Sequence, residues 1–157
     1  MQEYVFKLME SRKAYTSAEQ LLANKEYTEA VKYYKQVWMK DANYTDAQAK
    51  IKTAKEAYKA QVLTLVNEYK AEEKYQDAVD LLQKAKKLLE DDGEIDALVI
   101  HYQKENIKKK FLAYEAAKDY AGGIAYAKVN SSVIEADPDL SAKITAYIWT
   151  FGIIWNS

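Results

Sequence analysis

One short pattern occurs three times in this chain of 157 residues and constrains its fold more than any other feature. The copies cover residues 23–31, 71–79 and 116–124, and each reads small residue, polar residues, tyrosine, polar residues, small residue, aliphatic residue. Self-similarity at a period of about 20–50 residues is typical of repeat arrays. Helical arrays of this kind are mostly binding scaffolds, in which each repeat contacts its neighbours.

The composition favours helix almost throughout. Glycine and proline number only 4 and 1, whereas Ala, Lys, Glu, Leu and Gln are abundant. The length suits one domain with its own core. The 23 basic and 24 acidic residues nearly cancel, so the net charge gives no electrostatic reason to expect nucleic acid or an anionic membrane as a partner. The absence of cysteine excludes disulfides, thiolate catalysis and cysteine-based zinc sites.

Apolar residues spaced three and four apart predict helices along the whole chain. We expect an all-α fold in a single domain, residues 1–157, built from antiparallel helix-turn-helix hairpins stacked as an α-solenoid. The three hairpins cover about residues 3–41, 46–90 and 94–135, and a C-terminal capping helix covers about 138–155. The individual helices are expected at about 3–24, 27–41, 46–72, 75–90, 94–117 and 120–135.

Three local patterns predict where helices begin and end. Thr45 followed by Gln48 is a capping-box pattern at the start of the second long helix. Gly93 is available for the left-handed residue that often follows a helix. Asp137 followed by Pro138 predicts an N-cap with proline in the first helical position.

The C-terminal run from Ile144 to Trp155 carries no charge. As a helix it is apolar all round, and as a strand it alternates poorly, so the sequence leaves both open; we favour a capping helix over the end of the array. The run is too short to span a bilayer, although it is compatible with the start of a longer span. Trp149, Phe151 and Trp155 make this run a candidate surface for self-association.

The repeat extends beyond the short pattern when positions are counted from each tyrosine, Tyr27, Tyr75 and Tyr120. Equivalent positions in the longer helices then fall on one helix face. They are Ala14, Val62 and Ile107; Ala18, Val66 and Phe111; and Leu21, Tyr69 and Tyr114. Small residues should let the two helices of each hairpin approach closely. They are Ala30, Ala78 and Gly123 in the shorter helices, and Ala23, Ala71 and Ala116 at the ends of the longer ones.

This arrangement resembles the tetratricopeptide repeat (TPR), on residues 23–37, 71–85 and 116–127. The tyrosines are 48 and 45 residues apart. That spacing exceeds the family period of about 34 residues, so the chain is similar to an elongated form of the repeat. The resemblance implies a right-handed superhelix whose first helices line a groove for peptides or protein segments. By position, the groove residues would be Arg12, Tyr15, Glu19, Leu63, Asn67, Lys70, Lys108, Leu112 and Glu115.

No residue set in the sequence indicates catalysis, a metal or a cofactor. His101 is the only histidine and has no nucleophile near it in sequence, so we expect an ordinary surface or half-buried residue. The acidic residues 90–94 lack the loop spacing of an EF-hand. The lysines at 84–87 and 108–110 are flanked by acids and read as solvated faces. We expect a protein that is not an enzyme.

Three functions fit these observations. The first is a non-catalytic scaffold for a protein or peptide partner. The second is self-association, including a homodimer through the C-terminal apolar run. The third is a sensor or stalk domain of a larger bacterial protein, which would meet a membrane only through a tether outside this chain. The compartment stays open between the cytoplasm and the extracytoplasmic part of such a protein.

Overall fold

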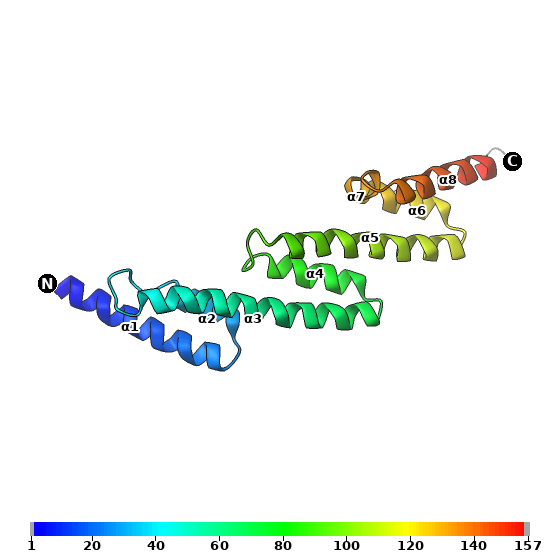
Figure 1. The fold of residues 1–157 in the computed structure, drawn as a ribbon. Coiled ribbons are helices and arrows are strands. Elements are labelled where there is room, and N and C mark those ends of the chain that lie inside the picture. Colours follow the sequence, from blue (N-terminus) through cyan, green and yellow to red (C-terminus); the bar gives the residue numbers. More distant parts are fainter. Residues whose placement is uncertain (1, 156–157) are drawn as a thin grey trace. The chain divides into compact units, whose positions relative to one another are not determined.

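The computed structural model describes the backbone of residues 2–155 and the side chains of residues 2–152. The described residues form helices and no strand, with 82% of the chain helical, which confirms the all-α class (Figure 1). The helices are α1 (Gln2–Ala23), α2 (Tyr27–Tyr34), α3 (Tyr44–Ala71), α4 (Tyr75–Ala85), α5 (Gly93–Ala116), α6 (Tyr120–Val129), α7 (Ser131–Glu135) and α8 (Pro138–Trp155). The C-terminal run is therefore helical, as favoured from the sequence.

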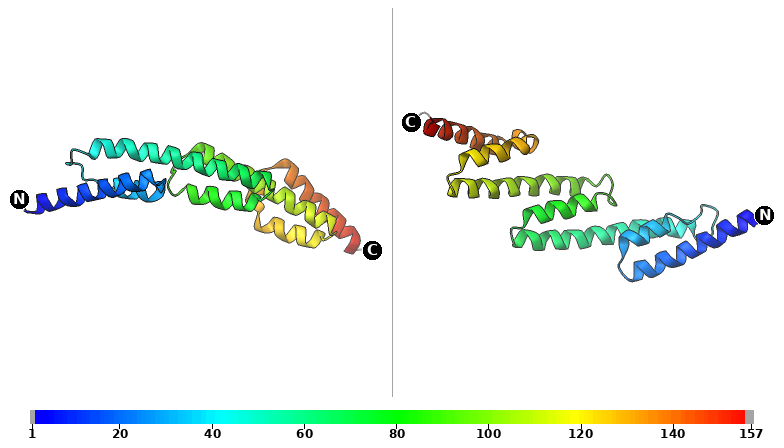
Figure 2. Two further views of the ribbon diagram at one scale, coloured as in Figure 1. Left: turned by 90° about the horizontal axis from the view of Figure 1, so that it is seen from below. Right: turned by 180° about the vertical axis from the view of Figure 1, so that it is seen from behind.

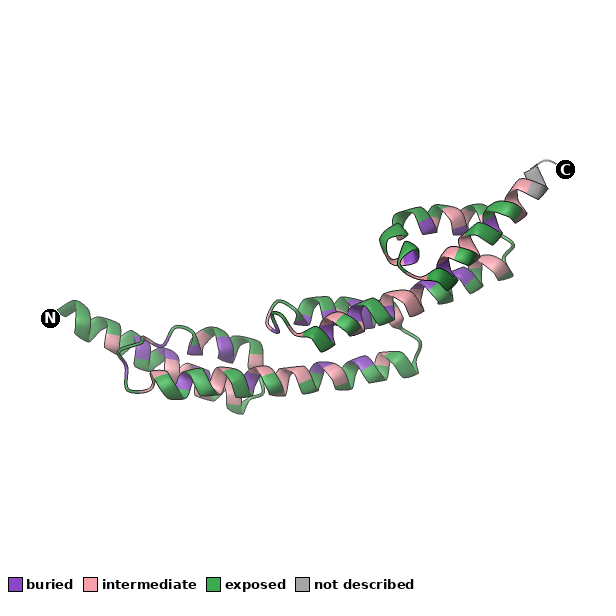
Figure 3. Cartoon of the chain, turned by 45° about the horizontal axis from the view of Figure 1, so that its top comes forward, coloured by how far each residue is buried: buried purple, intermediate pink, exposed green. Residues whose placement is uncertain are grey.

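The chain divides into two compact units. The N-terminal unit comprises Met1–Asn67 with Lys84–Asp91, and the C-terminal unit comprises Glu68–Gln83 with Asp92–Ser157. Each unit has its own set of buried side chains, which Figure 3 shows along the helices. The two units are therefore described one at a time.

The N-terminal unit is organised around the hairpin of α1 and α2, which lie side by side in both views of Figure 2. Tyr34 of α2 is fully buried at its centre, and Ala18 of α1 and Ala47 of α3 pack around that ring. Because the neighbours are alanines, three helices can approach one large aromatic side chain.

The C-terminal unit packs α5 against α6 and α7, and then adds α8. Its core consists of Ile107, Phe111, Ala127, Ile134, Leu140 and Tyr147. Phe111 meets the edge of the Tyr147 ring, with 5.5 Å between ring centroids. The first half of α5 has a different neighbour, α4, whose Tyr75 ring stacks on Tyr102 at 6.2 Å. The two halves of α5 therefore pack against different helices.

The repeated pattern forms the same backbone turn three times. In the first copy, the Glu26 N–H donates to the Leu21 carbonyl at 2.9 Å and the Lys25 N–H donates to the Leu22 carbonyl at 3.0 Å. This pair of bonds is the Schellman motif, in which the residue after the helix takes a left-handed conformation. Lys25 has φ of 62°.

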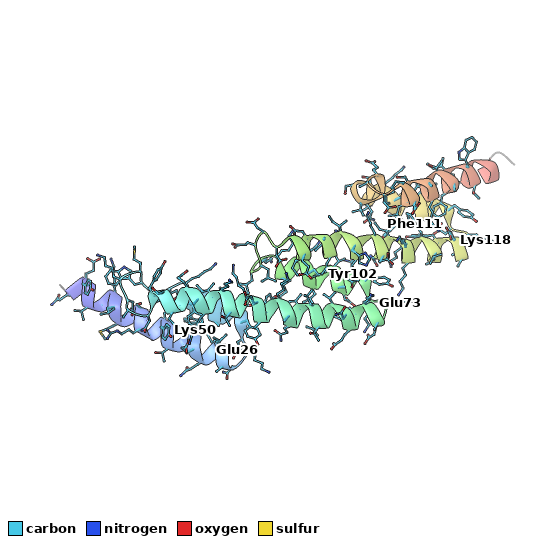
Figure 4. All side chains as sticks on the ribbon, viewed as in Figure 1. Glu26, Lys50, Glu73, Tyr102, Phe111 and Lys118 are labelled. Carbon is cyan, nitrogen blue, oxygen red and sulfur yellow. The ribbon has the colours of Figure 1, made fainter. Side chains whose placement is uncertain are left out.

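The second and third copies repeat this geometry. Their left-handed residues are Glu73 and Lys118, with φ of 53° and 56°, and both lie two positions before the tyrosine, as Lys25 does. The backbone bonds Lys74 to Tyr69 and Asp119 to Tyr114 measure 2.8 and 2.9 Å. Figure 4 labels Glu73, Lys118 and Glu26 at these turns. The pattern is therefore a structural turn that folds one helix back on the next.

The equivalent positions predicted for the core are buried in most columns. All six residues of the Ala14 and Ala18 columns are buried, and so are Ala30, Ala78 and Gly123 in the shorter helices. The prediction fails for Ala23, Ala71 and Ala116, which are exposed. They lie in the last turn before the left-handed residue, where the chain is already leaving the helix, so they do not lie at the helix crossing.

The shorter helices end earlier than predicted. The helix α2 ends at Tyr34 and α4 ends at Ala85, after which turns continue to the next long helix. The third of these helices is interrupted at Asn130, which separates α6 from α7. Side chains such as Leu89 remain buried in those turns, so their apolar spacing resembled a continuing helix.

Two of the three predictions for helix ends were wrong. The helix α3 begins at Tyr44, so Thr45 lies within its first turn and does not cap it. Gly93 is the first residue of α5, while Asp91 takes the left-handed conformation with φ of 58°. The third is confirmed, because Asp137 accepts hydrogen bonds from the N–H groups of Asp139 and Leu140 at 3.1 and 3.2 Å ahead of Pro138.

Candidate functional site

Two polar residues of the predicted groove, Tyr15 and Glu19, belong to a hydrogen-bond network within the N-terminal unit. Glu19 of α1 accepts hydrogen bonds from the Tyr34 hydroxyl of α2 and from the Lys50 ammonium of α3, the latter at 2.5 and 2.7 Å. Burial and this hydrogen bond to Glu19 raise the pKa of the Tyr34 hydroxyl, so it stays a donor at neutral pH. Glu19 thereby connects three helices.

Tyr15, one turn earlier on α1, extends the same network. Its hydroxyl donates to Asp46 of α3, and its ring meets the edge of Tyr34 with 5.9 Å between centroids. Lys50 is labelled in Figure 4. Its ammonium lies 5.8 Å from the centre of the Tyr15 ring. Tyr15 and Glu19 are thus committed to contacts inside the unit, which leaves little of either for a ligand.

A second polar cluster fastens the turn after α2 to α1. Ser11 and Asp41 are both buried, and the Ser11 hydroxyl donates to the Asp41 carboxylate at 2.6 Å while accepting from the Trp38 N–H at 2.8 Å. Burial alone would raise the pKa of Asp41. The Asn43 N–H, the Ser11 hydroxyl and the nearby Arg12 charge outweigh it, so that pKa lies below its ordinary value.

Glu115 has a comparable role in the C-terminal unit. It accepts from the Tyr147 hydroxyl at 2.9 Å and from the Lys143 ammonium at 2.8 Å, both on α8. The hydrogen bonds from Lys143 and then Tyr147 lower the pKa of Glu115. Glu115, like Tyr15 and Glu19, therefore makes its polar contacts within its own unit.

The remaining groove residues differ in exposure and are divided between the units. Leu63 is half-buried; the exposed ones are Arg12, Asn67, Lys70, Lys108 and Leu112. Lys108 forms an ion pair with Glu105 on its own helix at 2.9 Å. Leu112 is 59% exposed on α5, which is high for a leucine. Each unit therefore presents its own groove residues, Arg12 with Leu63 and Asn67 in one, and Lys70 with Lys108 and Leu112 in the other.

A group of apolar side chains is exposed on the first half of α1. Val5, Phe6 and Met9 are 51%, 64% and 64% exposed, and together with Gln2 they line a shallow hollow. We name these four residues the α1 apolar face. It lies on the side of the helix opposite Ser11 and Ala18, which pack against the rest of the unit. Contiguous apolar surface of this kind marks interaction sites.

The C-terminal unit exposes apolar side chains on α8. Trp149 is 70% exposed and Ile148 is 54% exposed, whereas Phe151 is half-buried. The side chain of Trp155 lies outside the described residues. Of the residues predicted for self-association, Trp149 is thus the one that the structure shows to be accessible.

The other residues singled out from the sequence lie on the surface. His101 is exposed, and its ring meets the edge of Tyr102 at 4.9 Å. Among the described residues, no group of three or more His, Asp or Glu side chains is placed to hold a metal ion. The lysines of the two runs are exposed, and Lys109 donates to the Glu73 carbonyl at 2.8 Å across the α3–α4 turn.

Comparison with known proteins returned no relative: no protein-family model, curated protein or solved structure matches this chain. Within the part of the chain that the structure describes, no helix combines the length and apolar character needed to cross a membrane.

The α1 apolar face was missed from the sequence, although the repeat contained a signal for it. Counting back from each tyrosine, Phe6 stands where Val99 stands in α5, and Met9 stands where Tyr102 stands. The columns were extended only through the second half of each long helix. The apolar character of the first half therefore looked like part of the general amphipathic pattern.

Proposed function

We propose that this chain is a non-catalytic scaffold of TPR-like type, whose three elongated hairpins stack as an α-solenoid and bind a protein partner. The observation that carries this proposal is the exposure of clustered apolar side chains in both units. Phe6 and Met9 in one unit and Trp149 in the other are each more than 60% exposed. Contiguous exposed apolar side chains such as Phe6 and Met9 are typical of protein interaction sites.

The internal repetition supports the same proposal. Three identical turns and equivalent buried positions describe units that reuse one packing solution, as repeat scaffolds do. The exposed groove residues, including Arg12, Lys70 and Lys108 with Leu112, offer charge and apolar area for a peptide. Tyr15, Glu19 and Glu115 make their polar contacts within their own units.

Site-specific photo-crosslinking in the source cell tests the proposal. A photoreactive amino acid is placed at Phe6, at Leu112 or at Trp149, and at the exposed Ile100 as a control position. We expect a discrete protein adduct from at least one of the three positions and none from the control. For an adduct at Phe6, the yield should fall at least tenfold with Met9→Glu; for an adduct at Leu112 or Trp149, it should fall at least tenfold with combined charge reversal of Arg12, Lys70 and Lys108. Absence of any adduct, or adducts that persist through both sets of substitutions, would reject the scaffold.

A second function, self-association through α8, is favoured by the exposed Trp149 and Ile148. Leu140 and Tyr147 of the same helix form the core of the C-terminal unit, so truncation of α8 would also unfold that unit. Point substitution avoids this problem. Light scattering of the wild type and of Trp149→Glu, at equal concentrations, should show a dimer that dissociates in the variant. Monomers in both samples would contradict self-association.

A further inference from the structure

The α1 apolar face occupies a position of the repeat that is covered in α5. Phe6 and Met9 correspond to Val99 and Tyr102 of α5, at 21 and 18 residues before the tyrosine of the following turn. Val99 and Tyr102 are only 8% and 4% exposed, whereas Phe6 and Met9 are both 64% exposed. The same helix face is thus closed in α5 and open in α1.

In α5 the cover is the short helix α4. The Tyr75 ring of α4 stacks on Tyr102, which is labelled in Figure 4. Gln76 of α4 accepts a hydrogen bond from Asn106 of α5 at 2.9 Å. The helix α4 presents the buried residues Ala78, Val79 and Leu82 on one stripe.

The first halves of α3 and α8 are covered by short helices in the same way. Ala47, Ile95 and Leu140, each 20 residues after the tyrosine of the preceding turn, are at most 1% exposed. Ala47 packs with Ala30 and Tyr34 of α2, and Leu140 packs with Ala127 of α6. Short helices therefore pack on the first halves of these three long helices, and two of them, α2 and α4, are amphipathic.

We propose that the α1 apolar face binds a short amphipathic helix of a partner protein, with a small residue and an aliphatic residue adjacent and a further apolar residue three positions later. This rests on the proposed scaffold function and specifies the partner's chemistry and its site. The Glu3–Lys7 ion pair, 2.7 Å across, and Glu10 give the face a polar rim, as protein-binding surfaces usually have.

A second copy of the chain has no such helix to offer among its described residues. The equivalent stripes of α2, α4 and α6 are all buried within the units: Ala30 and Val31 are at most 1% exposed, Ala78 is fully buried, and Gly123 is buried. Releasing one of them would unfold part of the donor. This burial argues against a second copy as the occupant of the face.

Methionine methyl NMR tests this directly, because the chain has 3 methionines and one of them lies in the face. The probe is a synthetic peptide with the sequence of residues 72–92, which contains α4. A side-chain-stapled version, helical by circular dichroism, is titrated in parallel because isolated short helices are marginal in water. We expect a saturable shift of the Met9 methyl signal. Met39 lines a hollow together with Phe6, so its signal reports on the edge of the same face.

Matched variants define the site. Phe6→Glu should weaken peptide binding at least tenfold, whereas Ile100→Glu, on a comparably exposed apolar residue, should leave it unchanged. On the peptide, Val79→Glu with Leu82→Glu should abolish the shift, and Gln83→Glu on the exposed side should preserve it.

Several outcomes would overturn the assignment. The assignment is wrong if the stapled peptide does not shift the Met9 signal, or if the shift persists in Phe6→Glu. A Met9 shift that depends on the concentration of the protein alone would assign the face to a second copy instead. If crosslinking at Leu112 or Trp149 still captures a partner, the scaffold stands and only this face is wrong; if both experiments fail, the scaffold fails as well.

Discussion

In the N-terminal unit the aromatic ring at the centre of the packing comes from the short helix, as Tyr34 of α2, whereas in the C-terminal unit it comes from the long helices. The positions are equivalent but the sizes are exchanged. Counted from the tyrosine of each turn, Tyr34 of the N-terminal unit is equivalent to Ala127 of the C-terminal unit. In the long helices the sizes are reversed: the N-terminal unit has alanine where the C-terminal unit has a large side chain. The pairs are Ala14 and Ile107, Ala18 and Phe111, Ala47 and Leu140, and Ala54 and Tyr147.

The exchange shows that the repeat specifies where a side chain is buried and leaves open which helix supplies the volume. A core needs its space filled to a density of about 0.75, and several distributions of large and small residues can achieve this. In each unit the hydroxyl of one buried tyrosine donates a hydrogen bond to a glutamate, Tyr34 to Glu19 and Tyr147 to Glu115. The polar contact accompanies the large ring, whichever helix carries it.

The largest effect should come from removing either central ring. Tyr34→Ala and Tyr147→Ala delete side chains that are 0% and 4% exposed, and each should lower the free energy of unfolding by about 3–5 kcal/mol. Urea denaturation followed by circular dichroism measures the loss. Phe6→Ala and Trp149→Ala, which truncate exposed rings of the same units, should change stability by less than about 1 kcal/mol. Equal losses in the buried and exposed variants would show that the rings do not fill the cores.

A graft of the C-terminal pattern into the N-terminal unit sharpens the comparison. Ala18→Phe installs the residue found at Phe111 against Tyr34, and overpacking should destabilise by about 3 kcal/mol. In the Tyr34→Ala background the new ring has space, so the double variant should be more stable than the sum of the two losses by about 0.5–3 kcal/mol. Additive losses in this double-mutant cycle would contradict the exchange of volume between the two helices.

The repeat made the helical class and most buried columns predictable because helical spacing and small residues leave a direct mark on the sequence. Ala30, Ala78 and Gly123 are examples. The ends of α2 and α4 were not predictable, since buried residues in the turns continue the apolar spacing. The roles of Glu19 and Glu115 were also hidden, because a glutamate bonded to a distant tyrosine looks the same in sequence as a solvated one.

A buried acid in the N-terminal unit provides a pH-dependent contrast. Asp41 lies 14 residues after the tyrosine of its turn, where the equivalent residues are Leu89 and Ile134. All three are buried. Asp41→Asn weakens the acceptor for the Ser11 hydroxyl and the Asn43 N–H, and should lower the free energy of unfolding at pH 7 by about 1–3 kcal/mol.

The sign of the pH dependence follows from the lowered pKa of Asp41, whose opposing causes are burial, which raises it, and the donated hydrogen bonds with the Arg12 charge, which lower it. Its contribution is fully present above the ordinary value of 3.8 and is lost as the pH falls through the lower folded value. Denaturation series between pH 7 and pH 2 should therefore show a smaller acid-induced loss in Asp41→Asn than in the wild type. If the free energy of unfolding fell equally with pH in the wild type and in Asp41→Asn, Asp41 would not contribute to the acid-induced loss of stability.

The smallest effect concerns the one element that the two units build identically, the left-handed turn. Lys25 and Lys118 adopt φ of 62° and 56°, where a side chain costs about 1–2 kcal/mol and glycine has no such penalty. Because glycine also gains entropy in the unfolded chain, Lys25→Gly and Lys118→Gly should each stabilise by no more than about 1 kcal/mol. The exposed helical positions Lys13 and Lys110 serve as controls, where glycine should destabilise by about 0.5–1 kcal/mol. Thermal and urea denaturation would detect these opposite changes in the free energy of unfolding. If glycine stabilised one turn and destabilised the other, the same backbone geometry would carry different strain in the two units.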